Sequence, residues 1–369
     1  MRSRTTLALA LILSLALAAC GGEGEPTGEE TSSPSSPAAS SSGTPATTGG
    51  TSDEPTLAEP VAAALDWRDT GVPAGTRYLK GVEWEALANV QNTTVELARD
   101  GDAVIVAAGS GRTISEILMS DAWAVVVRQD TAETDPSQAT TVDLATGERR
   151  DLVSPEPASG GSWAITDGDL YYPTYGEGGS YCLATAALAD GNGEDGWCAE
   201  PRTGWSGLTA SEHGVALMTF DDARPVACRT LNVLDGSGLP QPIEGPAECS
   251  GWDVAATAEG ALWSEVPKPR RQEEAHFHAS VDGTYFDLGP GTTGSAVACG
   301  DSVFFVRDPQ DDSEPARLMR WTPQHTLEIA YESVSTGNAF LGEPACGGGV
   351  LTLSSFGEAG DEQVSASVS

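Results

Sequence analysis

Two histidines and a glutamate lie close enough in the sequence to bind a metal ion together. His276 and His278 are two residues apart, with Glu274 two residues further back, so an extended strand would turn all three to one face. Imidazole and carboxylate groups are ligands of zinc. The surrounding stretch (PKPRRQEEAHFHAS) is rich in charged residues, which is typical of a solvated strand. We favour the solvated strand and predict no metal site here.

Two acidic stretches have the composition of cation-binding loops. The first, 190–195 (DGNGED), loosely matches a calcium loop, but Asp195 stands where that loop needs glycine, and Pro201 where it needs a closing glutamate. The second runs from Asp308 to Glu314. Both fit solvated turns better, so the sequence predicts no bound metal and no cofactor.

The residues of a nucleophilic enzyme are not evident. The sequence has no Gly-x-Ser-x-Gly motif, and its other histidines are His213, beside a Gly turn, and His325, after Pro323. Loops from distant segments could still assemble a Ser/His/Asp triad, but nothing in the sequence selects its members. We predict no catalytic residue and favour a protein that is not an enzyme.

The elements that must position these residues are β-strands. From about residue 61 onward, short apolar runs alternate with Gly and Asp turns, which is typical of hairpins. Only residues 81–90 show a weak helical periodicity. The clearest strands are Leu170–Tyr172, Val215–Phe220, Ala261–Trp263, Val303–Val306 and Val350–Leu353.

A repeat runs through these strands. Matching hairpin positions recur at steps of 42, 47, 43 and 45 residues, at Trp163, Trp205, Trp252, Ser295 and Phe340. A period of about 40 to 50 residues with strand texture is the spacing of a four-stranded propeller blade. Residues 141–147 (TVDLATG) and 231–236 (LNVLDG) each read as a third strand running into a tight turn.

On these residues the chain resembles the extracytoplasmic β-propellers of the TolB-like, quinoprotein-type and WD-repeat-like families, over about residues 76 to 369. The resemblance implies an all-β propeller of six to eight blades, with seven preferred, and it says little about function. The hairpins at 95–107 and 114–127 are closely spaced. Either one blade is degenerate or an early strand completes the last blade and closes the ring. The three Trp positions could line a carbohydrate-binding pore, but we expect them to pack between blades.

The cysteines favour an oxidising compartment. Six remain once Cys20 is set aside, and an even number suggests three disulfides, although fifteen pairings are possible. The repeat suggests local bonds from Cys182 to Cys198 and from Cys228 to Cys249. Cys299 and Cys346 occupy matching places in adjacent units, so a bond between them would join neighbouring blades.

The first residues read as an export signal that ends at Cys20. Arg2 and Arg4 precede the apolar stretch 7–18, which is too short to span a membrane. Residues 17–20 (LAAC) resemble the bacterial lipobox, which implies that residues 1–19 are removed and that Cys20 is acylated. The alternative is an ordinary signal peptide that ends near a cysteine; both export the chain.

The segment 20–60 has the composition of a disordered tether. It consists mainly of Ser, Thr, Pro, Gly, Ala and acids, with no basic residue, so it cannot bury enough apolar surface to fold. We therefore place the folded domain at 61–369.

The charge of the chain limits its partners. The net charge is -35, and removal of Arg2 and Arg4 with the leader leaves 17 basic against 54 acidic residues. Such a surface repels phosphate, which argues against nucleic acid. Lysine occurs only at Lys80 and Lys268, a bias that favours a GC-rich genome and, with the lipobox, an actinobacterium over a haloarchaeon.

Together these features predict a lipid-anchored propeller on the extracytoplasmic face of the cell membrane. We expect it to bind an envelope protein, a small molecule or a glycan through one rim or the mouth of its channel. The alternative is an envelope hydrolase or lyase, which a cluster of perturbed acids and histidine in the pore would favour. A passive structural component of the envelope is a third possibility.

Overall fold

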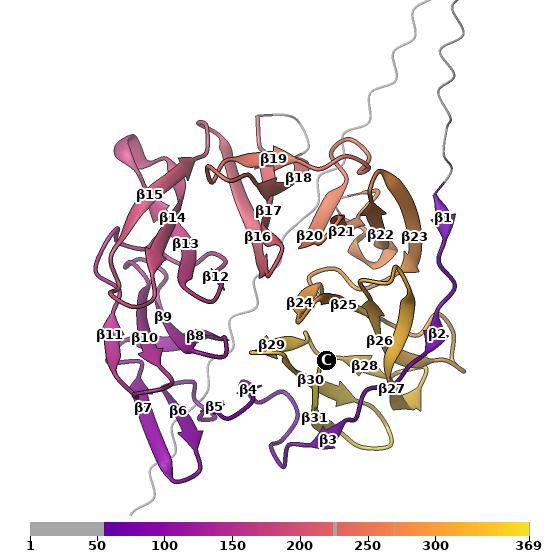
Figure 1. Cartoon of the computed structure of the whole chain (residues 1–369), viewed down its shortest axis with the longest axis horizontal. Helices are drawn as coiled ribbons and strands as arrows, with labels where there is room; N and C mark the ends of the chain where they lie inside the picture. Colours follow the sequence, from indigo (N-terminus) through magenta and orange to yellow (C-terminus); the bar gives the residue numbers. More distant parts are fainter. Residues whose placement is uncertain (1–54, 224–226, 269, 369) are drawn as a thin grey trace, which may run out of the picture. The chain divides into compact units, whose positions relative to one another are not determined.

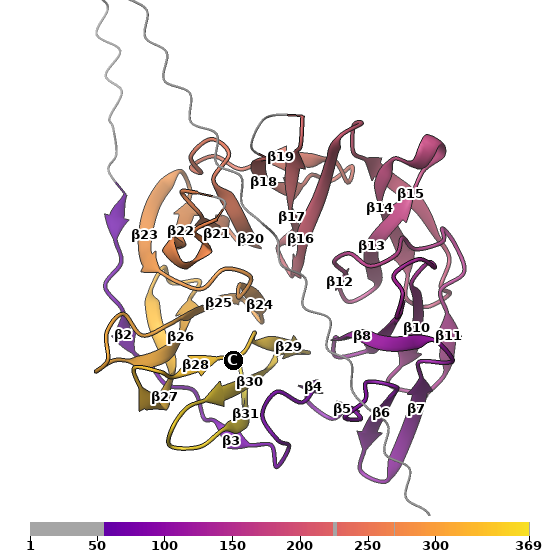
Figure 2. The ribbon, with the colours of Figure 1, turned by 180° about the vertical axis from the view of Figure 1, so that it is seen from behind.

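The computed structural model of the protein describes residues 55–223, 227–268 and 270–368. Regular structure in these ranges is β apart from two short 3-10 helices, η1 (Glu177–Gly179) and η2 (Gln272–Glu274). The strands form six hydrogen-bonded sheets arranged around a central axis (Figures 1 and 2). The all-β propeller predicted from the sequence is confirmed. In the described ranges no helix is long and apolar enough to cross a membrane.

Three of the sheets are four-stranded antiparallel meanders, each built from consecutive strands. The first contains β4 (Tyr78–Lys80), β5 (Glu85–Ala88), β6 (Thr94–Arg99) and β7 (Asp102–Ala107). The second contains β12 (Ala164–Ile165), β13 (Asp169–Tyr175), β14 (Tyr181–Ala187) and β15 (Gly193–Cys198). The third contains β16 (Thr203–Ser211), β17 (Gly214–Asp221), β18 (Cys228–Leu234) and β19 (Pro240–Pro242).

Two further meanders each gain a parallel fifth strand from the N-terminal segment. One contains β20 (Gly251–Thr257), β21 (Gly260–Glu265), β22 (His276–Val281), β23 (Thr284–Pro290) and the added β1 (Thr56–Leu57). The other contains β24 (Val297–Cys299), β25 (Ser302–Arg307), β26 (Pro315–Trp321), β27 (Leu327–Thr336) and the added β2 (Val61–Ala62). The chain thus joins the sheets at Thr56, before Val61, where the sequence placed the start of the folded domain.

The sixth sheet has nine strands: eight form its main path, as two runs of four joined at their inner edges, and a ninth pairs off this path. One run contains β8 (Arg112–Met119), β9 (Trp123–Asp130), β10 (Gln138–Asp143) and β11 (Arg149–Asp151). The other contains β29 (Ala345–Gly347), β30 (Val350–Phe356), β31 (Glu362–Ser367) and β3 (Arg68–Asp69), and β28 (Phe340–Leu341) pairs with β30. The join is a single parallel pairing of Gly347 with Met119.

The last run is completed by an early strand. β3 pairs antiparallel with β31, with Arg68 opposite Ser365. Trp67 supports this closure because its indole Nε1 donates a 2.7 Å hydrogen bond to the carbonyl oxygen of Ala330. Of the two sequence-based alternatives, completion by an early strand is therefore confirmed. The hairpin at 95–107 forms the two outer strands of the sheet that contains β4 to β7. The hairpin at 114–127 forms the two inner strands of the run from β8 to β11. Each set therefore has four strands, and neither is degenerate.

The hydrophobic core lies between neighbouring sheets. Trp163 stacks on Tyr172 and packs against apolar residues of β9 and β10. Trp205 is fully buried in a cluster with Leu183 and Leu217 from adjacent sheets. Trp163 and Trp205 pack between blades, as the sequence predicted, whereas Trp252 is half-buried with the Arg229 guanidinium over its ring. The weak helical periodicity at 81–90 was misleading, because this stretch contains the strand β5.

All three predicted disulfides are present. Cys182–Cys198 joins β14 to β15, and Cys228–Cys249 joins β18 to the segment before β20. Cys299–Cys346 joins the inner strands β24 and β29 of adjacent blades, with a Cα–Cα distance of 5.5 Å. The propeller repeat was therefore a sound guide to the pairing.

Candidate functional site

A central channel of about 1700 Å³ lies where the inner strands meet. The strands β4, β8, β12, β16, β24 and β29 and the loops at their ends contribute to its wall. The wall is mixed: backbone and small residues alternate with carboxylates and a few aromatic rings. Apolar side chains therefore do not fill the channel. We refer to this cavity as the channel.

Glu116 enters the channel wall from β8. The pairing of β8 with β9 shifts register between Ile114 and Glu116, so a β-bulge falls at Ser115. A bulge inserts one residue and reverses the alternation of side chains beyond it. Ile114 and Ile117 accordingly pack in the same core cluster although they are three residues apart. The bulge thus turns the acid of an otherwise apolar strand towards the channel.

A second acid and an arginine face Glu116. Arg77, in the segment before β4, donates a hydrogen bond from Nη1 to the carbonyl oxygen of Ser115. Glu343 lies in the loop before β29 and, like Arg77 and Glu116, lines the channel. Burial raises the pKa of Glu116 to about 8; the Arg77 guanidinium opposes this shift, and the charge of Glu343 adds to it. Burial also raises the pKa of Glu343, against the effect of Arg77.

A third carboxylate, Asp253 of β20, lies within electrostatic reach of Glu343. It accepts hydrogen bonds from the Ser264 hydroxyl at 2.5 Å and from the Gly294 amide at 2.9 Å. Burial raises the pKa of Asp253 to about 6, although both hydrogen bonds oppose the shift, and Glu343 raises it further. Burial therefore favours the neutral forms of all three acids, of which Glu116 and Glu343 line the channel and Asp253 does not.

Aromatic side chains lie at the same channel. Phe356 lines it and stacks on Phe340 with a centroid distance of 4.6 Å. Phe340 is 52% exposed, which is high for a large apolar side chain. Trp163 and Tyr171 also contribute to the wall. The channel thus combines carboxylates with rings, which are the groups that bind organic cations.

The histidines considered from the sequence lie elsewhere. His276 is hydrogen-bonded through Nε2 to Oδ1 of Asp287 at 2.5 Å, and His278 stacks on Trp263. Glu274 lies in η2 and bonds Arg271, so it does not share the histidines' strand. Within the three described ranges, no group of three or more His, Cys, Asp or Glu side chains is arranged to hold a metal ion. His213 and His325 pair with Glu212 and Glu259.

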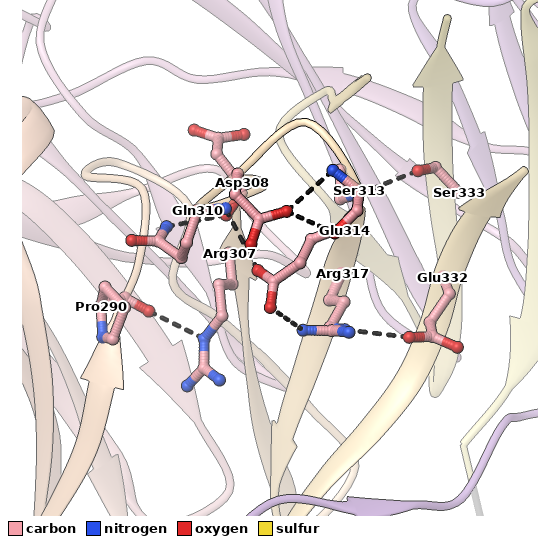
Figure 3. Close-up of polar contacts among 11 residues, drawn as sticks. Pro290, Arg307, Asp308, Gln310, Ser313, Glu314, Arg317, Glu332 and Ser333 are labelled. Carbon is pink, nitrogen blue, oxygen red and sulfur yellow. Dashed lines mark hydrogen bonds and ion pairs between the residues drawn. The ribbon is translucent and has the colours of Figure 1, made fainter. Parts of the chain in front are cut away.

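The first acidic stretch is a turn that continues into β15, the second is a loop, and some carboxylates in each have protein partners. Asp190 accepts a 2.9 Å hydrogen bond from the Asn192 amide at the tip between β14 and β15. Figure 3 shows the second loop, between β25 and β26, where Arg317 lies between Glu314 and Glu332. Gln310 donates to the carbonyl oxygen of Asp308 in the same loop. These contacts fit the solvated turns that the sequence predicted.

The remaining predicted site residues are the cysteines. Cys20, the predicted lipidation site, lies outside the described residues. Cys299 and Cys346 line the channel, so their bond also holds part of its wall.

Sequence reasoning missed the two channel acids, Glu116 and Glu343, and the buried acid Asp253. Glu116, Asp253 and Glu343 are far apart in the sequence, and none belongs to a motif. A usable signal is nevertheless present. Glu116 is the lone charged residue in the strand sequence RTISEILM after its first position, and Asp253 is the lone one in GWDVAAT. A single acid inside an apolar strand indicates either a buried partner or a functional site.

The sequence matches no family model and no curated protein. Solved structures are similar in fold. The β-propeller domain of the Trilobed protease from Pyrococcus furiosus gives a TM-score of 0.56 at 11% identity, over 80% of this chain and 96% of that chain. Prolyl endopeptidases give 0.53 at 13% identity, over 79% of this chain and 47% of theirs. TolB from Acinetobacter baumannii gives 0.41 at 14% identity, over 72% of this chain and 66% of that chain.

These similarities are informative about architecture alone. The chain spans less than half of the prolyl endopeptidase length, and all three identities are below 15%. The Trilobed protease propeller is described as having an open velcro topology, whereas here β3 pairs with β31. The comparisons identify the described part of the chain as a β-propeller.

Proposed function

We propose that the protein is a lipid-anchored, extracytoplasmic binding module whose channel takes a cationic ligand or a basic segment of an envelope protein. The observation that carries the proposal is that Glu116 and Glu343 both line one channel, with pKa values raised by burial. An entering cation would favour the ionised carboxylates and recover the desolvation energy that the free protein loses.

The size and lining of the channel support a binding role. Its volume of about 1700 Å³ exceeds the roughly 300 to 1,000 Å³ of ordinary small-molecule sites. A peptide segment or a polyamine-sized molecule would fit. Phe356 and Tyr171 line the same channel as Glu116 and Glu343. Nucleic acid stays an improbable partner on charge grounds, because the chain carries a net charge of -35.

We infer a ring of seven blades. The inference treats the nine-stranded sheet as two blades, because a single residue pair joins its two four-stranded runs. Each of the other five sheets then supplies one blade. A rigid ring of this kind holds loops from many blades around one channel, which suits recognition.

The extracytoplasmic location is supported by the three disulfides. Such bonds persist in oxidising compartments and are rare in the cytosol. The lipid anchor at Cys20 rests on the sequence of the leader, and we retain it as part of the proposal.

An envelope hydrolase or lyase is the alternative function. A carboxyl with a pKa near 8 beside a second carboxyl is suited to general acid–base chemistry at neutral pH. No histidine lines the described channel. Of the acids and histidine that would together favour an enzyme, the described channel therefore has the acids alone. The binding role therefore accounts for more of the channel.

Calorimetric titration with trilysine tests the proposal. We expect the wild-type protein to bind trilysine with a measurable heat. We also expect binding to release protons, because the bound ammonium groups lower the raised pKa values of the acids. Glu343→Gln should weaken binding about tenfold, as loss of one close charge pair does. Glu358→Gln removes the same charge from an exposed position outside the channel and should have no effect.

Two results would contradict the binding role. Trilysine binding that Glu358→Gln weakens as much as Glu343→Gln would indicate a general field effect. Hydrolysis of chromogenic glycosides or peptides that Glu116→Gln abolishes would assign the channel to the enzyme instead.

A further inference from the structure

The outer edge of β7 differs from the other blade edges in the described part of the chain. β1, β2 and β3 cover the outer edges of β23, β27 and β31. The edge strands β11 (RRD), β15 (GEDGWC) and β19 (PQP) carry charges, glycines or prolines. Such residues protect an edge from pairing with another chain. β7 reads DAVIVA, which is apolar after its first residue, and no described strand pairs with its outer side.

The outward backbone groups of β7 are paired with no described strand, although the carbonyl oxygen of Ile105 accepts a side-chain hydrogen bond. β6 and β7 are joined by the two-residue turn Asp100–Gly101, and the amide of Ala108 donates to the carbonyl oxygen of Thr93. Hydrogen-bonded pairs alternate along an antiparallel ladder. Ala103, Ile105 and Ala107 therefore turn their amide and carbonyl groups outward. The carbonyl oxygen of Ile105 confirms this direction, because it accepts a 2.8 Å hydrogen bond from Nη1 of Arg149 on β11.

A basic pocket of about 330 Å³ adjoins this edge. Val106 and Ala107 of β7 form one side, and Arg128, Arg149 and Arg150 contribute to the other, with Thr140 and Asp151. Glu148 pairs with Arg150, and Asp151 bonds Nη2 of Arg128 at 3.0 Å. Arg149 has no carboxylate partner among the described ion pairs, and Nε of Arg128 is buried without a hydrogen-bond partner in the described residues.

The pocket indicates what the edge would bind. The chain has a net charge of -35, whereas three arginines and one aspartate line this pocket. A buried guanidinium N–H without a partner favours a carboxylate, which guanidinium groups bind in a fork geometry. An apolar edge strand favours an extended peptide, because such a peptide can pair with the edge through main-chain hydrogen bonds, which do not depend on its sequence. An extended peptide that carries a carboxylate would match both features.

We propose that β7 and the adjoining arginine pocket bind an extended peptide segment of another protein, with an acidic side chain or a terminal carboxylate placed against Arg128 and Arg149. The segment lies along Ala103–Ala107 as a fifth strand. The same chain already accepts such strands, since β1 and β2 extend two other blades in this way. This site is separate from the channel and does not depend on the function proposed for it, because no β7 residue lines the channel.

Fluorescence anisotropy with a defined peptide tests the site. The probe is a labelled peptide of about eight residues that alternates valine and threonine and ends in two aspartates with a free carboxyl group. The comparison peptide has asparagines and an amidated end. We expect the full-length protein to bind the acidic peptide at least tenfold more tightly than the neutral one, as loss of a charge-assisted hydrogen bond predicts.

Three variants localise the binding. Ile105→Pro removes an outward amide while keeping the pairs that β7 makes with β6, and it should weaken binding at least tenfold. Arg149→Gln should weaken binding of the acidic peptide and leave binding of the neutral peptide unchanged. Arg202→Gln is the control, because Arg202 is an exposed arginine that also donates to a backbone carbonyl, that of Asp222. Circular dichroism melting verifies that each variant folds.

The proposal is wrong if the wild-type protein binds both peptides equally, or if Ile105→Pro leaves the affinity unchanged. It is also wrong if sedimentation shows a dimer that Ile105→Pro dissociates, because a second copy of the chain would then occupy the edge.

Discussion

Glu116 illustrates how the fold alters an ordinary side chain. In water its carboxyl would ionise near pH 4.5, but burial in the channel wall raises the pKa to about 8. The folded protein therefore holds a proton that the unfolded chain has lost between these two pH values. The free energy of unfolding falls as pH rises through that window, because the folded state binds more protons there.

Glu116→Gln should remove this dependence. At pH 4.5 and below, the variant and the wild type should have similar stability, because a protonated Glu and a Gln are both neutral. Towards pH 8 and above, the variant should become more stable than the wild type by up to a few kcal/mol. Urea unfolding at a series of pH values measures the difference. The exposed Glu96→Gln serves as the control, and a difference for Glu116→Gln that stays constant with pH would contradict the assigned shift.

Individual residues were the least predictable feature of the sequence. The cysteines could be paired because each lies at a recognisable place in a repeat, and the structure confirms all three bonds. The acids of the channel could not be grouped. Glu116 and Glu343 lie far apart in the sequence, and the pairing of β8 with β29 brings their segments together. The bulge at Ser115, which turns Glu116, has no evident sequence pattern.

Among the elements, strands bounded by Gly and Asp turns were predictable, and β5 was not. Trp84, Ala86 and Ala88 are buried, while Leu87 is exposed, so the stretch has the alternation of a strand. Its residues (EALA) have high helix propensity, which obscured the pattern. The strands β1 and β2 were missed for a different reason. Each has two residues, both exposed, and pairs only because a blade edge lies beside it.

The bond between β24 and β29 should contribute more to stability than the bond within one hairpin. Cys299 and Cys346 are 47 residues apart, whereas Cys182 and Cys198 are 16 apart. In the chain-entropy model the longer loop restricts the unfolded chain more, by about 4 kcal/mol against about 3 kcal/mol. Paired Cys→Ala variants of each bond, compared by urea unfolding, measure the two contributions. A larger loss for the Cys182–Cys198 pair would show that native packing, and not loop length, determines the ranking.

At the scale of the whole molecule, closure of the ring determines which surfaces exist. The N-terminal segment covers three outer edges, on β23, β27 and β31, and supplies the last strand of the final run. The repeat in the sequence predicted a propeller, but it could not show which edges would be covered. It also could not show that β7 would be left with an apolar edge beside arginines. Such surfaces depend on neighbouring blades and are not encoded in one repeat.

The location of the molecule is the remaining large-scale expectation, and it depends on one thiol. If Cys20 is acylated, the attached chains hold the protein at the membrane, since more than one acyl chain gives stable anchoring. Cys20→Ala should then be exported but released, or retained with its leader uncleaved. Membrane fractionation and mass spectrometry of the N-terminal peptide distinguish these outcomes. Cys182→Ala with Cys198→Ala is the matched control, because it removes two cysteines elsewhere and should leave the protein in the membrane fraction. A wild-type protein recovered without acyl groups and soluble outside the cell would contradict the anchor but not the export.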